Sequence, residues 1–148
     1  MQAGDLIDDF ELPDQHGERR SLSGLLADGP IVLFFYPKAM TSGCTKESCH
    51  FRDLAGEFAD AGAQRVGISA DSVDKQAEFD DKNNLGFPLL SDTDKAVARL
   101  FGVKRPGPLI NKRSTFVIDT DRRVLDVISS EMNMTTHADQ ALATLTNR

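Results

Sequence analysis

The hydrophobic residues of the chain occur either in short unbroken runs or at helical spacing, and the two patterns alternate. Residues 31–36, Ile-Val-Leu-Phe-Phe-Tyr, are all apolar and predict a buried strand, and residues 64–69 predict a second one. Between these runs, apolar side chains recur every three or four residues from residue 42 to residue 60. This spacing predicts one amphipathic helix that ends near Gly62.

The remainder of the chain continues the alternation. Expected helices cover residues 72–82, 92–101 and 137–147, and expected strands cover residues 87–90, 113–119 and 124–129. Ahead of the first buried strand, residues 9–22 predict a β-hairpin and residues 23–27 a short helical turn. Strands that alternate with helices predict an α/β fold. No linker divides residues 1–148, so we expect a single domain.

Composition and charge exclude several classes of protein. The chain has 148 residues and a formal net charge of −6, and this acidity argues against a nucleic-acid partner. No apolar run is long enough to span a membrane, and the N-terminus lacks the basic and apolar regions of a signal peptide. We therefore expect a cytoplasmic protein, in which a cysteine pair is redox-active or metal-binding rather than structural.

Both cysteines lie at the junction between the first buried strand and the long helix. Pro37 ends the strand, because proline has no N–H for a central β-ladder. Thr41 or Ser42 can cap the helix with a side-chain oxygen, which places Cys44 in the first turn. Backbone N–H groups there lack intrahelical partners and, with the helix dipole, favour an anion such as a thiolate. Cys44 is therefore predicted to be a reactive thiol rather than a small core residue.

Cys49 lies five residues after Cys44 on the same predicted helix. In a regular α-helix this spacing separates the two Cα atoms by about 8.7 Å. A disulfide requires a separation of about 6.8 Å or less. The two sulfurs can therefore bond only if the segment unwinds. Cys49 falls off the apolar stripe of the helix, so core packing explains it poorly, and a bystander thiol is the alternative.

The residues around Cys44 resemble the active-site pattern of the peroxiredoxins, thiol peroxidases of the thioredoxin superfamily. The resemblance rests on Pro37-x-x-x-Thr41-x-x-Cys44, and the second cysteine five residues later is similar to the bacterioferritin comigratory protein, or peroxiredoxin Q, branch. Further similar segments occur at residues 34–38, 44–47, 67–71, 88–92, 101–103 and 113–119. The resemblance implies a thioredoxin-like fold, with a central mixed β-sheet flanked by helices and an N-terminal β-hairpin extension.

The resemblance also implies a role for each matched residue. Cys44 would attack the peroxide O–O bond and become a sulfenic acid, and Cys49 would condense with it to an intramolecular disulfide. Thr41 would hydrogen-bond the peroxide, and Pro37 would shield the sulfenate from water. Arg113 would stabilise the thiolate and the charge that develops on the leaving oxygen.

Two further residues are expected to support this set. Glu47 would orient Arg113, and Gly43 belongs to the same supporting group. The implied activity reduces hydrogen peroxide and organic hydroperoxides without metal, haem or flavin, and a thioredoxin-type reductant would recycle the enzyme. Because an intrachain disulfide makes a dimer unnecessary, a monomer is expected.

The active-site loop departs from the branch at two positions. Met40 stands where the branch often has a polar residue, and Ser42 stands where it often has a proline. These differences bear on the stiffness of the loop and on the preference for hydrophobic peroxides. The loop of residues 104–112 also has no clear counterpart in the branch.

Three other functions fit parts of the pattern. A general disulfide oxidoreductase usually has Cys-x-x-Cys, whereas this chain has Cys-x-x-x-x-Cys. A one-cysteine peroxidase would leave Cys49 as a bystander. A copper-binding protein could use two thiolates and a histidine, but the five-residue spacing and the absence of an obvious third ligand argue against it. His16 and His50 are expected at the surface, and His137 is expected to cap the last helix or to face solvent.

Overall fold

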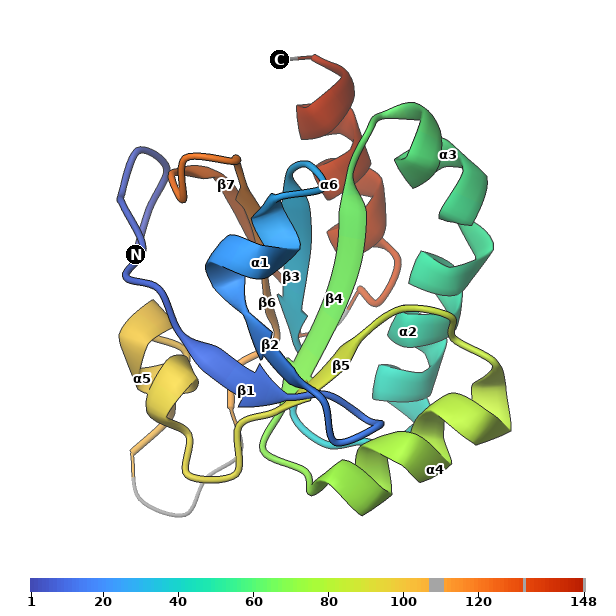
Figure 1. Ribbon diagram of the computed structural model, residues 1–148. Helices are drawn as coiled ribbons and strands as arrows, with labels where there is room; N and C mark the ends of the chain where they lie inside the picture. The colour runs from blue at the N-terminus through green and yellow to red at the C-terminus, as the bar shows by residue number, and fades with distance from the viewer. Residues whose placement is uncertain (107–110, 132, 148) are drawn as a thin grey trace.

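A computed structural model describes residues 1–106, 111–131 and 133–147 and shows a five-stranded sheet with helices on both faces (Figure 1). The strands are β3 (Ile31–Phe35), β4 (Gln64–Ser69), β5 (Leu89–Ser91), β6 (Ser114–Ile118) and β7 (Val124–Ser129), in the order β5-β4-β3-β6-β7. β3, β4 and β5 are parallel, whereas β6 and β7 run antiparallel to their neighbours. The predicted α/β fold with a mixed sheet is therefore confirmed.

The position of β3 at the centre of the sheet explains why its sequence is apolar without interruption. The helices are α1 (Leu22–Leu26), α2 (Ser42–Asp53), α3 (Ala55–Asp60), α4 (Val73–Asn83), α5 (Ala96–Phe101) and α6 (Thr136–Thr146). The odd-numbered side chains of β3 pack in an apolar cluster with α1 and α5, and the even-numbered ones pack in a second cluster with α2, α3, α4 and α6. Successive side chains of a strand point to opposite faces, so a strand covered on both faces must be apolar throughout.

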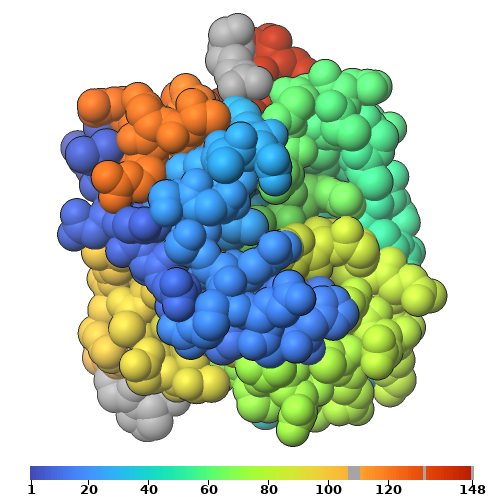
Figure 2. All heavy atoms as spheres, viewed as in Figure 1, coloured from blue at the N-terminus to red at the C-terminus, as the bar shows by residue number. Residues whose placement is uncertain are grey.

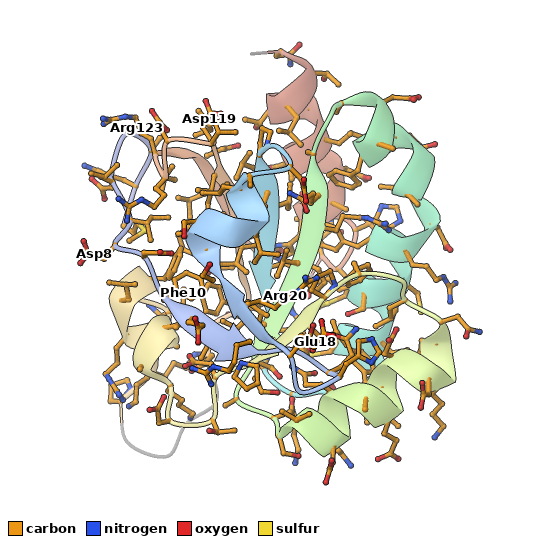
Figure 3. The ribbon with its side chains drawn as sticks, viewed as in Figure 1. Asp8, Phe10, Glu18, Arg20, Asp119 and Arg123 are labelled. Atoms are coloured by element: carbon orange, nitrogen blue, oxygen red, sulfur yellow. The ribbon has the colours of Figure 1, made fainter. Side chains whose placement is uncertain are left out.

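The N-terminal segment forms the predicted hairpin and closes one face of the sheet. β1 (Glu11–Pro13) pairs antiparallel with β2 (Arg19–Ser21), and the first 30 residues spread over the face shown in Figure 2. The Gly4 N–H donates to the Val124 carbonyl oxygen at 2.8 Å, which ties the chain start to β7. Figure 3 accordingly shows Asp8 and Phe10 on the same side of the molecule as Asp119 and Arg123 of the β6–β7 turn.

The single helix predicted over residues 42–60 is wrong, because the structure divides it into α2 and α3 at Leu54. Arg65 on β4 binds carbonyl groups at this break. Its Nη1 atom donates to the carbonyl oxygens of Phe51 at 3.0 Å and Arg52 at 3.4 Å. These are acceptors that the next helical turn would otherwise use. The helix that holds both cysteines is therefore a separate element of 12 residues.

The helix predicted over residues 92–101 begins four residues later than expected. Asp92 is fully buried, and its carboxylate accepts hydrogen bonds from the N–H groups of Val97 at 3.1 Å and Ala98 at 2.8 Å. Asp92 thus caps α5 from the end of β5 instead of opening the helix. The strand expected at residues 87–90 is likewise shifted to β5, and the other boundaries agree to within one or two residues. The loop of residues 104–112 lies partly outside the described residues.

Within the described ranges, no helix combines the length and the apolar character needed to cross a membrane.

Phe51 packs α2 against the sheet, and its truncation to alanine should lower the stability of the protein. The ring is fully buried and stacks on Phe34 of β3, with centroids 4.1 Å apart. We expect Phe51→Ala to lower the free energy of unfolding by about 3–5 kcal/mol, measured by urea denaturation. Leu100→Ala, at a side chain 37% exposed, is the control and should change it by roughly 0.5 kcal/mol or less. Equal losses in the two variants would contradict this account of the core.

Candidate active site

The loop after β3 is anchored by a carboxylate from the neighbouring parallel strand. Asp71 follows β4, and its Oδ2 atom accepts hydrogen bonds from the Ala39 N–H and from the Ser69 hydroxyl, both at 2.7 Å. The carboxyl ends of β3 and β4 meet at the lower edge of the sheet in Figure 1, where α2 begins. The loop that contains Pro37 and leads into α2 is thus held at a fixed place by the sheet.

Thr41 occupies the N-cap position of α2, but its side chain does not cap the helix. The Thr41 hydroxyl donates instead to the Lys38 carbonyl oxygen at 2.8 Å, and Ser42 is the first helical residue. The predicted side-chain cap is therefore wrong. Thr41 is exposed at the start of the helix, and its hydroxyl is oriented by the loop.

Cys44 meets Arg113 in the first turn of α2. The Cys44 side chain is fully buried, and the Arg113 Nη2 atom donates to its Sγ at 3.3 Å. Arg113 lies 69 residues later in the chain, immediately before β6. Because β6 is antiparallel to β3 and Ser114 pairs with Phe35, the start of β6 lies beside the end of β3. The sheet register therefore brings the predicted cation to the predicted thiol.

The second arm of the Arg113 guanidinium contacts Glu47, one helical turn after Cys44. Nη1 donates to the Glu47 Oε1 atom at 2.7 Å, and the two side chains are 6% and 0% exposed. Burial raises the pKa of Glu47 to about 7, while the Arg113 charge acts in the opposite direction. Burial acts to lower the pKa of Arg113, but Glu47 and Cys44 raise it above its ordinary value. The arginine is therefore a cation held between a carboxylate and a sulfur.

Glu131 adds a carboxylate at the outer side of the site, which the sequence did not indicate. Its Oε1 atom accepts from the Arg113 backbone N–H at 3.0 Å and from the Arg105 Nη2 atom at 2.9 Å. Glu131 therefore fixes the backbone of Arg113, while Glu47 fixes its side chain. No local motif could have identified Glu131, because its partner is a backbone group of a distant segment.

The prediction that His137 caps the last helix or faces solvent is wrong. Its side chain is fully buried at the start of α6, where Nε2 donates to the Ser130 carbonyl oxygen and Nδ1 lies near the Thr115 hydroxyl, both at 2.8 Å. Nε2 is also 3.7 Å from the Glu47 Oε2 atom. Burial lowers the pKa of His137, which favours a neutral ring behind the Glu47–Arg113 pair.

The other two histidines, His16 and His50, differ in exposure and in their contacts. His16 is exposed in the hairpin turn, as predicted. The His50 side chain is 26% exposed, and its Nε2 atom lies 2.8 Å from the Asp139 Oδ1 atom. His50 therefore joins α2 to α6 instead of standing free at the surface.

Cys49 contacts the C-terminal end of α4. Its thiol is half-buried against the apolar cluster that contains Cys44, and its Sγ lies 3.7 Å from the Asn83 Oδ1 atom. Cys49 therefore has some packing in the core, although the sequence places it off the apolar stripe of the helix. Both thiols are free, and both lie on the uninterrupted helix α2, in which their Cα atoms are about 8.7 Å apart.

Comparisons with known proteins find similarity over most of the chain. The AhpC/TSA family matches residues 3–127. A putative peroxiredoxin of Mycobacterium tuberculosis is 65% identical over 148 residues, which cover 98% of this chain and 96% of that protein. The crystal structure of peroxidoxin BcpB from Mycobacterium tuberculosis has a TM-score of 0.97 and 63% identity, and the match covers 99% of this chain and 97% of that one.

A third similar protein is more distant in sequence. It is the bacterioferritin comigratory protein of Xanthomonas campestris, solved in a study of its alkyl peroxide reduction activity. Its TM-score is 0.86 at 34% identity, and the match covers 93% of this chain and 90% of that one. These matches confirm the thioredoxin-like fold that the sequence resemblance implied.

The raised pKa of Glu47 should make the stability of the folded state depend on pH. The pKa of Glu47 is about 7 in the folded protein, above the ordinary value of 4.5. The contribution of Glu47 to stability is therefore fully present below pH 4.5 and is lost as the pH rises through 7. We expect the free energy of unfolding of the wild type, relative to Glu47→Gln, to fall by about 1–3 kcal/mol between pH 5 and pH 8.

Urea denaturation at several pH values measures this difference. Glu57→Gln removes an exposed carboxylate on α3 and controls for the change in net charge. Wild-type and Glu47→Gln stabilities that run parallel across this pH range would contradict the assignment.

Proposed function

Because this chain belongs to the AhpC/TSA family, within its Bcp and peroxiredoxin Q branch of thiol-dependent peroxidases, we propose that its reactive group is the Cys44 thiolate. Its substrate is a peroxide, and a thiol supplies the electrons. The observation that carries the proposal is the buried Arg113 side chain, which donates to Cys44 through one nitrogen and to Glu47 through another.

The first step forms a bond between the Cys44 sulfur and the terminal peroxide oxygen, and the O–O bond breaks. The leaving oxygen takes a proton and departs as water or an alcohol, while Cys44 becomes a sulfenic acid. The Arg113 cation stabilises both the thiolate and the negative charge that develops on the oxygens. Thr41 contributes its hydroxyl, which Lys38 orients, and Pro37 limits the access of water to the sulfenate.

Glu47 and Gly43 act on this set without touching the peroxide. Glu47 holds the guanidinium so that Nη2 faces the sulfur. Gly43 leaves room beside that nitrogen, because a methyl group placed on it would lie 3.4 Å from the Arg113 Nη2 atom. A larger side chain at residue 43 would press on the arginine.

The second step joins Cys49 to Cys44. The Cys49 thiolate attacks the sulfenic sulfur, an S–S bond forms, and water leaves. Because the two residues lie five positions apart on α2, this step requires α2 to unwind locally and Cys49 to leave Asn83. A thioredoxin-type reductant then regenerates both thiols. We propose that residues 1–148 carry out this cycle as one domain and as a monomer in the cytoplasm.

A thiol count by alkylation and intact mass tests the two-cysteine cycle. One equivalent of peroxide should convert two free thiols to none, without a covalent dimer, because both electrons come from one chain. Cys44→Ser should keep its remaining thiol, and Cys49→Ser should stop at an oxidised Cys44. If the wild type retains one thiol, the protein is a one-cysteine peroxidase and Cys49 is a bystander.

Arg113→Lys tests whether the forked side chain is required. A lysine ammonium cannot donate to Cys44 and Glu47 with the same planar geometry, so we expect the rate of Cys44 oxidation to fall by about 10–100-fold. Stopped-flow single-turnover oxidation measures this rate. Arg105→Lys is the control, because Arg105 is a partly exposed arginine that contacts Glu131.

Loss of folding has to be separated from loss of reactivity. The double variant Arg113→Ala with Glu47→Gln removes both charges, and so avoids leaving an unpaired carboxylate in the core. It should fold and react slowly with peroxide. A rate equal to that of the wild type in Arg113→Lys would remove Arg113 from the mechanism.

A further inference from the structure

A chain of buried hydrogen bonds links the ends of the three parallel strands, and the chemistry described above does not use it. Tyr36 follows β3, Ser69 ends β4 and Gln76 belongs to α4, and all three side chains are fully buried. The Tyr36 hydroxyl donates to the Gln76 Oε1 atom. The Gln76 Nε2 atom donates to the Ser69 hydroxyl oxygen at 3.0 Å and to the Leu90 carbonyl oxygen at 2.9 Å.

The chain of hydrogen bonds ends on Asp71, which joins it to the active-site loop. The Oδ2 atom of Asp71 accepts from the Ser69 hydroxyl and from the Ala39 N–H, both at 2.7 Å. The Asp71 N–H also donates to the Ser69 hydroxyl oxygen at 3.2 Å. Every hydroxyl and amide donor from Tyr36 onwards therefore points towards this one carboxylate. Hydrogen bonds that follow one another in this way polarise and strengthen each other.

The loop that Asp71 holds contains a strained residue. Met40 has a φ angle of 69°, a left-handed conformation that residues with a branched or long side chain rarely adopt. Such a conformation persists only where the surrounding structure imposes it. Ala39, on one side of Met40, is buried and bound to Asp71. Thr41, on the other side, donates its hydroxyl to the Lys38 carbonyl oxygen at 2.8 Å. The contact with Asp71 therefore fixes the bend that places Thr41.

We propose that Asp71 is a positioning residue for the attack of Cys44 on a peroxide. Through the Ala39 N–H, it holds the loop in the conformation that presents the Thr41 hydroxyl beside the sulfur. The inference rests on the proposed function of Cys44. Asp71 acts as a hydrogen-bond acceptor, because its partners in the loop and on β4 are neutral N–H and O–H groups. A displacement of about 1 Å in a group that contacts the reacting atoms can lower a rate about 100-fold.

Substitutions along the chain of hydrogen bonds should have graded effects. Asp71→Ala removes both acceptor contacts and lets the loop relax, so the rate of Cys44 oxidation should fall about 10–100-fold. Asp71→Asn keeps an amide oxygen at the position of Oδ2 and should stay within about 3-fold of the wild-type rate. Ser69→Ala removes one partner of Asp71 but leaves the Ala39 contact, so we expect a fall of about 3–10-fold.

Two rates measured on the same variants separate positioning from general damage. The parent is Cys49→Ser, which leaves Cys44 as the only thiol of the chain. The first rate is the oxidation of Cys44 by hydrogen peroxide, followed by stopped flow in single turnover without a reductant. The second is the alkylation of Cys44 by iodoacetamide, which needs a reactive sulfur but no contact with Thr41. In Asp71→Ala the alkylation rate should stay within about 3-fold of the parent or rise, because a looser loop exposes the sulfur.

Asp74→Ala is the matched control, because it removes an exposed carboxylate three residues later, in the first turn of α4. It should leave both rates unchanged. An unaltered peroxide rate in Asp71→Ala would overturn the inference, and so would a parallel fall of the peroxide and alkylation rates. If Asp71→Asn is as slow as Asp71→Ala, the charge and not the hydrogen bond acts, and the inference is again wrong.

Ser69→Ala decides the same question through its smaller fall if Asp71→Ala does not fold. Failure of the proposed function has a different signature from failure of this inference. In that case hydrogen peroxide would not oxidise Cys44 even in the Cys49→Ser parent, whereas failure of the inference alone leaves the parent reactive and the Asp71 variants equally fast.

Discussion

The buried ion pair between Arg113 and Glu47 is the interaction on which the site depends. Removing two charges from water is expensive, and the cost is tolerable only when each charge has a partner with good geometry. Here the guanidinium meets Glu47 at 2.7 Å and Cys44 at 3.3 Å. The pair joins α2 to the start of β6, so the same contact that orients the cation also holds the cysteine helix against the sheet.

The sheet makes this contact possible. Three separate strand ends supply the parts of the site: β3 leads into the loop with Pro37 and Thr41, β4 leads to Asp71, and β6 follows Arg113. Their registers bring these segments to one edge of the sheet. Behind them, His137 and Thr115 form buried hydrogen bonds that close the polar environment of Glu47. A rigid apolar scaffold thus supports a small number of polar groups whose positions are well defined.

The helix that holds both cysteines has two requirements that oppose each other. For the proposed attack of Cys44 on a peroxide, α2 must be folded, because its first turn places Cys44 beside Arg113. For disulfide formation under the proposed cycle, the same helix must unwind. α2 is separated from α3 at Leu54, and the Cys49 sulfur has a long polar contact with Asn83, so α2 can unwind without α3. The stacking of Phe51 on Phe34 opposes that unwinding.

Local patterns in the sequence determined the elements of this protein and the position of its thiol. The unbroken apolar run at β3 and the motif from Pro37 to Cys44 are properties of neighbouring residues, and they predicted the buried strand and the place of Cys44 in the first turn of a helix. The helical spacing after them predicted a helix but not its division into α2 and α3. The resemblance named Arg113 as one partner of Cys44, and the tertiary structure alone decided which other distant groups lie around the two residues. His137, Glu131 and Met134 have ordinary local surroundings in the sequence, and their positions follow from the packing of α6 and of the segment before it against β6 and α2. At the break near Leu54, a carbonyl group of α2 likewise binds Arg65 of β4. The burial of a side chain and its pairing with a distant residue arise only after folding. They depend on which surfaces of the folded chain meet, and the neighbouring residues in the sequence do not determine that.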